Sequence, residues 1–342
     1  MRKRSGGERM ERGLIAYYDL GTSNVRIFLL DGEKRLLCTR RRALGAKDAA
    51  IDGSNRRLLE GMKALYDEVL AEAGRTDGEV EAIYASGMAT SPYGIFEILH
   101  YPAPVTAEEF ALRGVTLYRE DIVFGRELHL ISGLKTVGAD VSSTNNTRGE
   151  EIEVLGVLPE LAARYPGRQV AVILPGSHTH VLLAGEGRLT GILSTFTGEL
   201  FHALKQDTIL APVLSVESDR PDARAVALGL ENLRHYGFNR ALYIGHAMRV
   251  FERESTHFRR CYCEAVVSGG VIEALDAYCE ERWTECDTAV VVANPYMAEL
   301  FTLLLAGSRR VHSHSALTAD GDKSYALEGL RGILNIRERT KK

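Results

Sequence analysis

The feature that most constrains the fold of this chain is a pattern of strands and turns that occurs twice. In residues 14–40 an apolar, β-prone run enters the turn Asp19-Leu20-Gly21-Thr22-Ser23-Asn24, and two further strand-like runs follow. In residues 169–198 a strand over 170–174 enters the turn Pro175-Gly176-Ser177-His178-Thr179-His180, and again two strands follow. Because duplication at this scale is far more specific than either turn alone, it predicts two related halves, each opening on a three-strand meander.

The composition of these turns is compatible with anion binding. Gly, Thr, Ser and Asn can point backbone N–H groups and hydroxyls at an anion, and the leading carboxylate of Asp19 can hold a hydrated Mg²⁺. An ordinary hairpin, in which Asp19 and Asn24 only satisfy the turn backbone, is the alternative for one turn taken by itself. Two such turns facing each other could grip a triphosphate from both sides.

The remaining segments indicate an α/β fold in two domains. In the first half, a helix over 56–73, a strand over 81–85 and a short strand over 128–131 alternate with loops. In the second half we expect strands over 241–244 and 288–293 and helices over 198–210, 222–236, 261–280, 296–306 and 327–337. At 342 residues the chain exceeds one typical domain. We predict a disordered basic lead-in over 1–13 and domains over 14–167 and 168–342.

Composition and charge exclude several classes of protein. The net charge of −4 gives no general attraction to nucleic acid or to an anionic membrane, and no apolar run approaches the length of a membrane-spanning helix. Residues 1–12 lack the apolar core of a signal peptide. The five cysteines indicate reduced thiols in a cytoplasmic protein, and the last four lack the C-x-x-C spacing of a zinc site. His312 and His314 alternate along an expected strand, where a surface or core role outweighs metal binding.

With these motifs in view, the sequence resembles the 2-dehydro-3-deoxygalactonokinases of the sugar kinase and actin-like ATPase superfold. The resemblance spans residues 14–210 and weakens afterwards. Its landmarks are the two turns, Ser86-Gly87-Met88, Arg148-Gly149-Glu150-Glu151 and Thr197-Gly198-Glu199-Leu200. The resemblance implies two ribonuclease H-like domains around a central cleft, with ATP, Mg²⁺ and a keto-deoxy sugar acid as ligands, and a possible homodimer.

The resemblance also implies roles for individual residues. Asp19 would position Mg²⁺, directly or through water. The predicted phosphate and nucleotide contacts are Gly21, Thr22, Ser23, Asn24, Gly176, Ser177, His178, Gly198 and Glu199. Ser86, Gly87 and Met88 fall where family members line the sugar pocket.

Glu150, at the head of a helix, is the candidate general base that takes the proton from the sugar hydroxyl. Glu151 competes with it, and the sequence does not separate the two. A carboxylate that only stabilises the helix dipole is the structural alternative. Arg148 could neutralise the substrate carboxylate or the transferring phosphoryl group, because its planar fork grips two oxygens. Arg42 is a second candidate for an anion contact. The alternative is that Arg42 is only a solvent-exposed residue at the end of a strand.

The chain departs from the family pattern at several positions. Family members carry lysine and tryptophan where this chain has His180-Val181, so a fixed positive charge is replaced by a mostly neutral side chain. The family pattern also differs at three later segments, which here read Ile244-Gly245-His246-Ala247, Ser268-Gly269-Gly270 and Ala293-Asn294-Pro295. We therefore keep two alternatives to phosphorylation of 2-dehydro-3-deoxygalactonate at its 6-hydroxyl: a kinase of this fold with another acceptor, and a non-catalytic sensor of a sugar acid or nucleotide.

Overall fold

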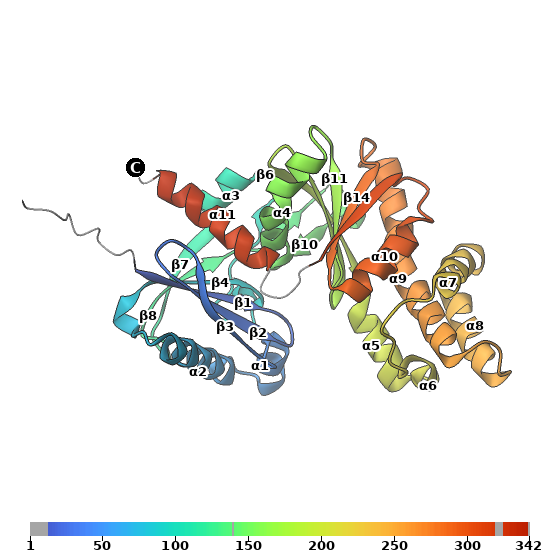
Figure 1. The fold of residues 1–342 in the computed structure, drawn as a ribbon, viewed down its shortest axis with the longest axis horizontal. Coiled ribbons are helices and arrows are strands. Elements are labelled where there is room, and N and C mark those ends of the chain that lie inside the picture. The colour runs from blue at the N-terminus through green and yellow to red at the C-terminus, as the bar shows by residue number, and fades with distance from the viewer. Residues whose placement is uncertain (1–12, 139, 319–323, 341–342) are drawn as a thin grey trace, which may run out of the picture. The chain divides into compact units, whose positions relative to one another are not determined.

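The computed structural model describes residues 13–138, 140–318 and 324–340, which divide into two compact units (Figure 1). Unit 1 comprises Met1–Tyr101, Glu108–Gly133 and Leu330–Lys342, and unit 2 comprises Pro102–Ala107 and Leu134–Gly329. All of the predicted lead-in except Gly13 lies outside the described residues. The domain boundary at 167/168 stays a prediction, and the compact units group residues 134–167 with the second half of the chain.

Unit 1 is built on a six-stranded sheet in the order β3-β2-β1-β4-β8-β7. Its strands are β1 (Leu14–Leu20), β2 (Val25–Leu30), β3 (Leu36–Arg42), β4 (Val80–Gly87), β7 (Val115–Glu120) and β8 (Arg126–Ile131). β1, β2 and β3 form an antiparallel meander, and β4 pairs in parallel with both β1 and β8. The predicted first meander is therefore confirmed.

Unit 2 repeats this topology. Its sheet has the order β15-β14-β11-β12-β13-β6, with β6 (Val105–Thr106), β11 (Val170–Leu174), β12 (His178–Gly185), β13 (Arg188–Phe196), β14 (Thr288–Ala293) and β15 (Ser313–Thr318). β11, β12 and β13 form the antiparallel meander, and β14 pairs in parallel with β11 and β15. The two sheets thus share the same five-strand order and direction, so the α/β fold with duplicated meanders that the sequence predicts is confirmed.

Helices and a small third sheet accompany the two six-stranded sheets. The helices are α1 (Ala46–Asp52), α2 (Arg56–Ala73), α3 (Ala107–Arg113), α4 (Glu150–Arg164), α5 (Gly198–Asp207), α6 (Ala211–Leu214), α7 (Ala223–Tyr236), α8 (Phe238–Val250), α9 (Thr256–Glu281), α10 (Pro295–Leu305) and α11 (Tyr325–Thr340). A three-stranded sheet has the order β10-β9-β5, with β5 (Tyr101–Pro102), β9 (Leu134–Thr136) and β10 (Asn145–Thr147).

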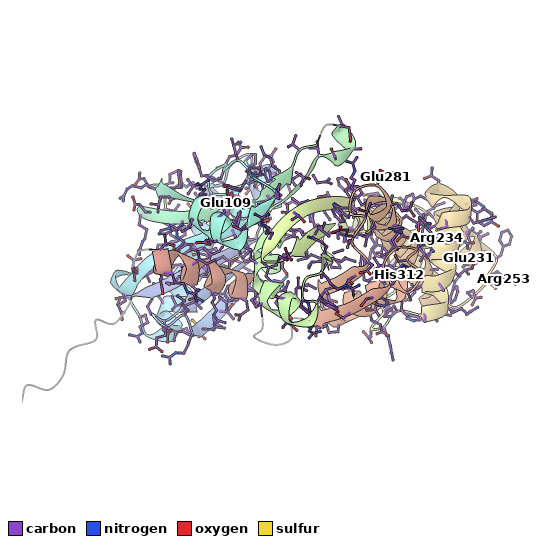
Figure 2. All side chains as sticks on the ribbon, turned by 90° about the horizontal axis from the view of Figure 1, so that it is seen from above. Glu109, Glu231, Arg234, Arg253, Glu281 and His312 are labelled. Carbon is purple, nitrogen blue, oxygen red and sulfur yellow. The ribbon has the colours of Figure 1, made fainter. Side chains whose placement is uncertain are left out.

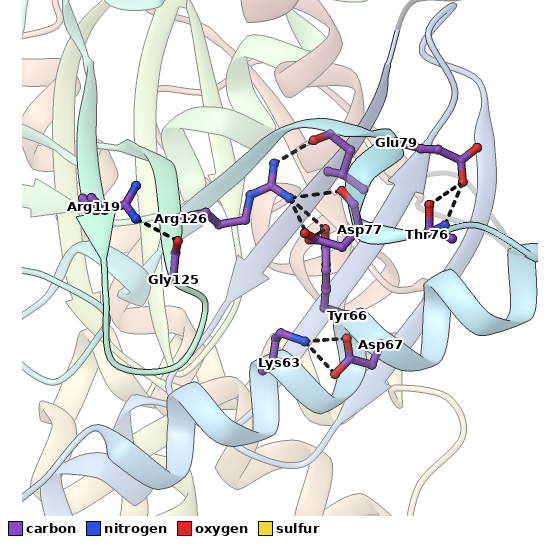
Figure 3. A network of polar contacts seen from close by, with 10 residues as sticks. Lys63, Tyr66, Asp67, Thr76, Asp77, Glu79, Arg119, Gly125 and Arg126 are labelled. Atoms are coloured by element: carbon purple, nitrogen blue, oxygen red, sulfur yellow. Dashed lines mark hydrogen bonds and ion pairs between the residues drawn. The ribbon is translucent and has the colours of Figure 1, made fainter.

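Helix α2 covers the first meander and matches its predicted bounds. Its buried residues recur at helical spacing and pack on β2 and β3; they are Leu58, Leu59, Met62, Leu65, Tyr66, Val69 and Leu70. The helix ends at Gly74, whose φ of 64° is left-handed. A polar network joins α2 to Asp77 in the segment after it and to Arg126 of β8 (Figure 3). Arg126 donates to Asp77 Oδ1 (2.7 Å) and to the carbonyl of Val80 (2.7 Å), and the Tyr66 hydroxyl donates to the same Asp77 carboxylate (2.6 Å).

The expected strand over 241–244 is wrong, because these residues belong to helix α8. The buried residues of α8 are Ala241, Leu242 and Gly245, which lie on one helical face. A Cβ on Gly245 would meet Cys263 Sγ at 2.2 Å, so α8 packs tightly on α9. An apolar run of four residues does not distinguish a strand from a buried turn of helix. The strand expected near the two late histidines is β15, which begins one residue after His312.

Helices α7, α8 and α9 lie side by side in unit 2 (Figure 1). Arg234 of α7, labelled in Figure 2, pairs with Glu273 (2.5 Å) and with the fully buried Asp276 (3.6 Å) of α9. Asp276 also accepts the backbone N–H groups of Arg309 (2.9 Å) and Arg310 (3.2 Å), which ties α9 to the loop after α10. Within 13–138, 140–318 and 324–340, none of the helices has the length and apolar content that spanning a bilayer requires.

Candidate functional site

The first predicted phosphate turn joins β1 and β2 in unit 1. The turn is closed by the backbone N–H of Gly21, which donates to the carbonyl of Asn24 (2.8 Å). Asp19 lies one residue before the end of β1, opposite Arg26 on β2 and Ser86 on β4. Burial raises the pKa of the Asp19 carboxyl, and the charges of Arg26 and Arg41 oppose that rise. A cation bound by Asp19 would favour the ionised form and would offset the same desolvation.

Helix α1, which the sequence analysis did not predict, donates hydrogen bonds to the backbone of this turn. The N–H groups of Ala46 and Lys47 donate to the carbonyls of Gly21 (3.3 Å) and Thr22 (2.9 Å). Gly45 is required for this approach, because a Cβ there would lie 2.3 Å from the Thr22 carbonyl oxygen. The signal that could have revealed α1 is Gly45 followed by Asp48, whose carboxylate accepts the Gly45 N–H (2.8 Å).

The residues expected to contact the sugar lie in different surroundings in unit 1. Ser86 is fully buried, and its hydroxyl bonds to the hydroxyl of Tyr17 (2.7 Å). Gly87 has φ +69° in the left-handed region, which turns the chain out of β4. Met88 is half-buried against the core of unit 1. Arg42 is held on α2 by Glu68 (2.6 Å) and by the carbonyl of Gly61 (3.3 Å).

The second predicted phosphate turn joins β11 and β12 in unit 2 and is seated against the start of α5. A Cβ on Gly198 would lie 2.4 Å from the Gly176 carbonyl oxygen, and the N–H of Glu199 donates to the Ser177 carbonyl (2.8 Å). His178 Nε2 lies 3.0 Å from Glu199 Oε2. The five residues that were predicted here are therefore brought together in one place.

Glu150 and Glu151 differ sharply in their surroundings at the start of α4. Glu151 is fully buried, and its carboxylate accepts the Gly149 N–H (2.9 Å) and the Thr147 hydroxyl (2.8 Å). Burial, with the charge of Glu150 beside it, raises the pKa of Glu151 to about 7. Glu150 keeps 28% of its side chain exposed, accepts the N–H of Arg148 (3.0 Å), and lies 3.8 Å from His180 Nε2. Of the two carboxylates, Glu150 is the one that a substrate hydroxyl could reach.

The sequence analysis missed a polar group that Arg260 and Glu264 of α9 form with Tyr296 of α10 in unit 2. The carboxyl ends of the parallel strands β11 and β14 share an edge, where Asn294 caps α10 by accepting the Met297 N–H (3.0 Å). In the first turn of α10, the Tyr296 hydroxyl donates to Glu264 and accepts from Arg260 Nη1 (2.6 Å). Arg260 also pairs with Glu264 (2.9 Å). Arg260 and Tyr296 are half-buried and Glu264 is buried, and their spacing in the sequence gives no motif.

Among the residues that the structure describes, no group of three or more His, Cys, Asp or Glu side chains could hold a metal ion. A site with one carboxylate still fits Mg²⁺, which retains several waters and commonly takes its remaining ligands from substrate phosphates. Asp19 beside a turn of backbone N–H groups and hydroxyls meets that requirement.

Comparison with known proteins identifies relatives along most of the chain. The model of the family described as 2-keto-3-deoxy-galactonokinase matches residues 19–331. A protein of Rhizobium meliloti (strain 1021) named probable 2-dehydro-3-deoxygalactonokinase DgoK1 is 30% identical over 199 residues, which are 58% of this chain and 58% of the relative's own length. A crystal structure from Sinorhizobium meliloti assigned the same enzyme name superposes with a TM-score of 0.72 at 23% identity, covering 96% of this chain and 99% of that one.

Proposed function

Because the chain belongs to the 2-keto-3-deoxy-galactonokinase family, we propose that it transfers the γ-phosphoryl group of ATP to a hydroxyl of a small sugar acid. The acceptor that the family name supports is 2-dehydro-3-deoxygalactonate, with its 6-phosphate as the product. The observation that carries this proposal is the duplicated sheet. Each copy presents a turn at the same topological position, between the first two strands of its meander.

In the proposed reaction, each of the two turns offers, within its own unit, groups that can bind phosphate oxygens. The turn at Gly21–Asn24 and the turn at Gly176–His178 supply backbone N–H groups and hydroxyls, and Gly198 leaves room for the second turn to pack on α5. Mg²⁺ held through Asp19 would neutralise charge on the phosphates. Arg148 adds a fixed positive charge next to the proposed base.

Glu150 acts as the general base. Its carboxylate takes the proton as the O–H bond of the acceptor breaks, the acceptor oxygen bonds to the γ-phosphorus, and the bond to the bridging oxygen breaks so that its electron pair leaves with ADP. The partial exposure of Glu150 and the enclosure of Glu151 support this choice. Glu151 instead fixes the backbone that leads into α4 by accepting the Gly149 N–H.

The test is ADP release with Mg²⁺-ATP across a panel of sugar acids and neutral sugars that includes 2-dehydro-3-deoxygalactonate and its gluconate epimer. We expect turnover on one keto-deoxy acid and a loss of roughly 10²–10⁴-fold in kcat for Glu150→Gln. Glu160→Gln is the matched control, because Glu160 lies on the same helix and pairs with Arg164 one turn further along it (2.5 Å). Turnover on another compound would replace the acceptor, and nucleotide binding without any turnover would favour the sensor.

A further inference from the structure

His180 lies between Ser194 and Glu150 in a chain of polar contacts. It is the third residue of β12, it is 8% exposed, and its two ring nitrogens face different partners. Nδ1 lies 3.0 Å from Ser194 Oγ on β13, and Nε2 lies 3.8 Å from Glu150 Oε1. All three residues belong to unit 2, so their arrangement is fixed within one compact body.

The hydrogen bonds of Ser194 determine which ring nitrogen carries the proton. Its hydroxyl donates to the carbonyl of Asn146 (3.0 Å), and a carbonyl can only accept. Since a hydroxyl has a single hydrogen, Ser194 Oγ can only accept from His180, and Nδ1 must be the N–H donor. The backbone N–H of Ser194 is in turn held by Asn145 Oδ1 (3.0 Å). In the neutral ring, Nε2 therefore presents a lone pair toward Glu150.

The ring is neutral at physiological pH. Burial, and secondarily the neighbouring His178, lowers the pKa of His180 to about 4. The titratable or charged groups of unit 2 in this neighbourhood include His178 on the same strand, Glu199 on α5 paired with it, Glu151 and Glu153 in the first turn of α4 with Glu150, and Arg148 before α4.

We propose that His180 is a positioning residue that increases the proton affinity of Glu150, by offering its Nε2 lone pair to the protonated carboxyl. This inference rests on the proposed function, in which Glu150 gains a proton as phosphoryl transfer proceeds. A small rotation of either side chain closes the 3.8 Å separation to a hydrogen bond once the carboxyl carries its proton. An ionised carboxylate has no such bond to make with a bare nitrogen, so the protonated form alone is stabilised.

The opposite effect is expected from a lysine at this position, which the family pattern carries. A cation within about 4–6 Å of a carboxylate favours its ionised form and lowers its proton affinity. His180 thus gives this chain a base that binds its proton more firmly and works at higher pH.

The first test is independent of activity. Two-dimensional ¹⁵N NMR of the full-length protein labelled in histidine reports the tautomer of each ring, with the His180 signals assigned by their loss in His180→Asn. We expect the Nδ1–H tautomer at neutral pH, and its replacement by a mixture of tautomers in Ser194→Ala. A protonated Nε2, or an imidazolium at pH 7, would overturn the proposal.

The second test compares the acidic limb of the kcat/KM profile among variants at fixed Mg²⁺-ATP, so that the ionisation of the nucleotide cancels. We expect His180→Lys to move the limb down by about one pH unit or more, and His180→Asn to lower kcat at neutral pH by about 10-fold, the effect of one lost hydrogen bond. His202→Asn, at an exposed histidine of α5, is the matched control. Variants that lose thermal stability or kcat without moving the limb would assign His180 a structural role and overturn the proposal. Absence of turnover in the unmodified enzyme would instead reject the proposed function, and this inference with it.

Discussion

Gly198 approaches Gly176 so closely that a Cβ on Gly198 would lie 2.4 Å from the Gly176 carbonyl oxygen. The contact joins the first residue of α5 to the second turn, and it explains why position 198 is a glycine. The turn and the helix start are therefore one rigid element, and their alignment depends on the missing side chain.

Gly198→Ala tests this contact. Because a backbone carbonyl cannot move aside cheaply, we expect the turn to shift, with a loss of stability of about 1–3 kcal/mol and weaker binding of Mg²⁺-ATP. Chemical denaturation and calorimetric titration would measure the two effects. Gly270→Ala on α9 is the control, because a Cβ there meets nothing within 4 Å and alanine favours helix. Unchanged nucleotide affinity in Gly198→Ala would remove this turn from the binding site.

The buried carboxyl of Glu151 gives stability a distinctive pH dependence. Its pKa rises from 4.5 to about 7 on folding, so between these values the folded state holds a proton that the unfolded state has lost. The free energy of unfolding should therefore fall as pH rises from about 4.5 to 7, by about 3 kcal/mol from this group. Denaturant unfolding at several pH values would measure the slope.

Glu151→Gln should remove most of that slope, because an amide does not titrate. The amide oxygen can still accept the Gly149 N–H, but the amide NH2 then faces the Thr147 hydroxyl, which must accept instead of donate, and we expect a cost of about 1 kcal/mol. An identical slope in wild type and variant would assign the pH dependence to other groups. A loss of kcat as large as that of Glu150→Gln, at equal folding, would make Glu151 the base.

The hydroxyl pair between Tyr17 and Ser86 allows a double-mutant cycle. Because Ser86 is fully buried and bonds to Tyr17 across β1 and β4 (2.7 Å), we expect Ser86→Ala to cost about 1 kcal/mol of stability. In the background of Tyr17→Phe the same change should cost less. KM for the acceptor should stay within about twofold of wild type. An increase of 10-fold or more in KM would support the role in sugar binding that the family pattern implies.

Asp19→Asn tests the proposed metal position. We expect kcat to fall by at least about 100-fold, because a metal ion stabilises several kcal/mol of transition-state charge, and we expect excess Mg²⁺ not to restore it. Asp31→Asn is the control, since Asp31 occupies the next turn of the same meander and pairs with Arg35 (2.8 Å). If Asp19→Asn needs more Mg²⁺ for saturation but then reaches the wild-type kcat, Asp19 contributes only to the affinity for Mg²⁺.

The sequence predicted the parts of the fold that repeat or are strongly periodic. Both meanders were predictable because apolar, β-prone runs are separated by Gly-containing turns, and α2 because seven buried positions recur over a long helix that ends at Gly74. The wrong strand over 241–244 was too short to show a period. Helix α1 was missed because it is stabilised by carbonyls of the distant turn at Gly21 and Thr22 rather than by its own pattern.

The candidate site was predictable only where residues are adjacent in the chain. Gly176, Ser177, Gly198 and Glu199 belong to two motifs that the resemblance assigns to the nucleotide, but the contact between the two motifs was not predicted. The pairing of Arg42 with Glu68 and the network of Arg260, Glu264 and Tyr296 depend on helix packing over long sequence separations. Whether Glu150 or Glu151 is enclosed likewise depends on a one-residue rotation around α4, which no spacing rule reveals.

Helix α11 carries a consequence for how the protein forms during synthesis. Its residues from Leu330 onward belong to unit 1, where Lys34 bonds to Asn335 (2.6 Å) and Glu338 (2.9 Å). Along the sequence, almost all of unit 2 comes after the sheet strands of unit 1 and before the residues of α11 that belong to unit 1. A ribosome that emits the chain from its N-terminus therefore finishes unit 2 before it delivers the last segment of unit 1. Unit 1 is thus the first unit to be synthesised and the last to be completed. Until the end of α11 emerges, its sheet must avoid aggregation without the helix segment from Leu330 onward.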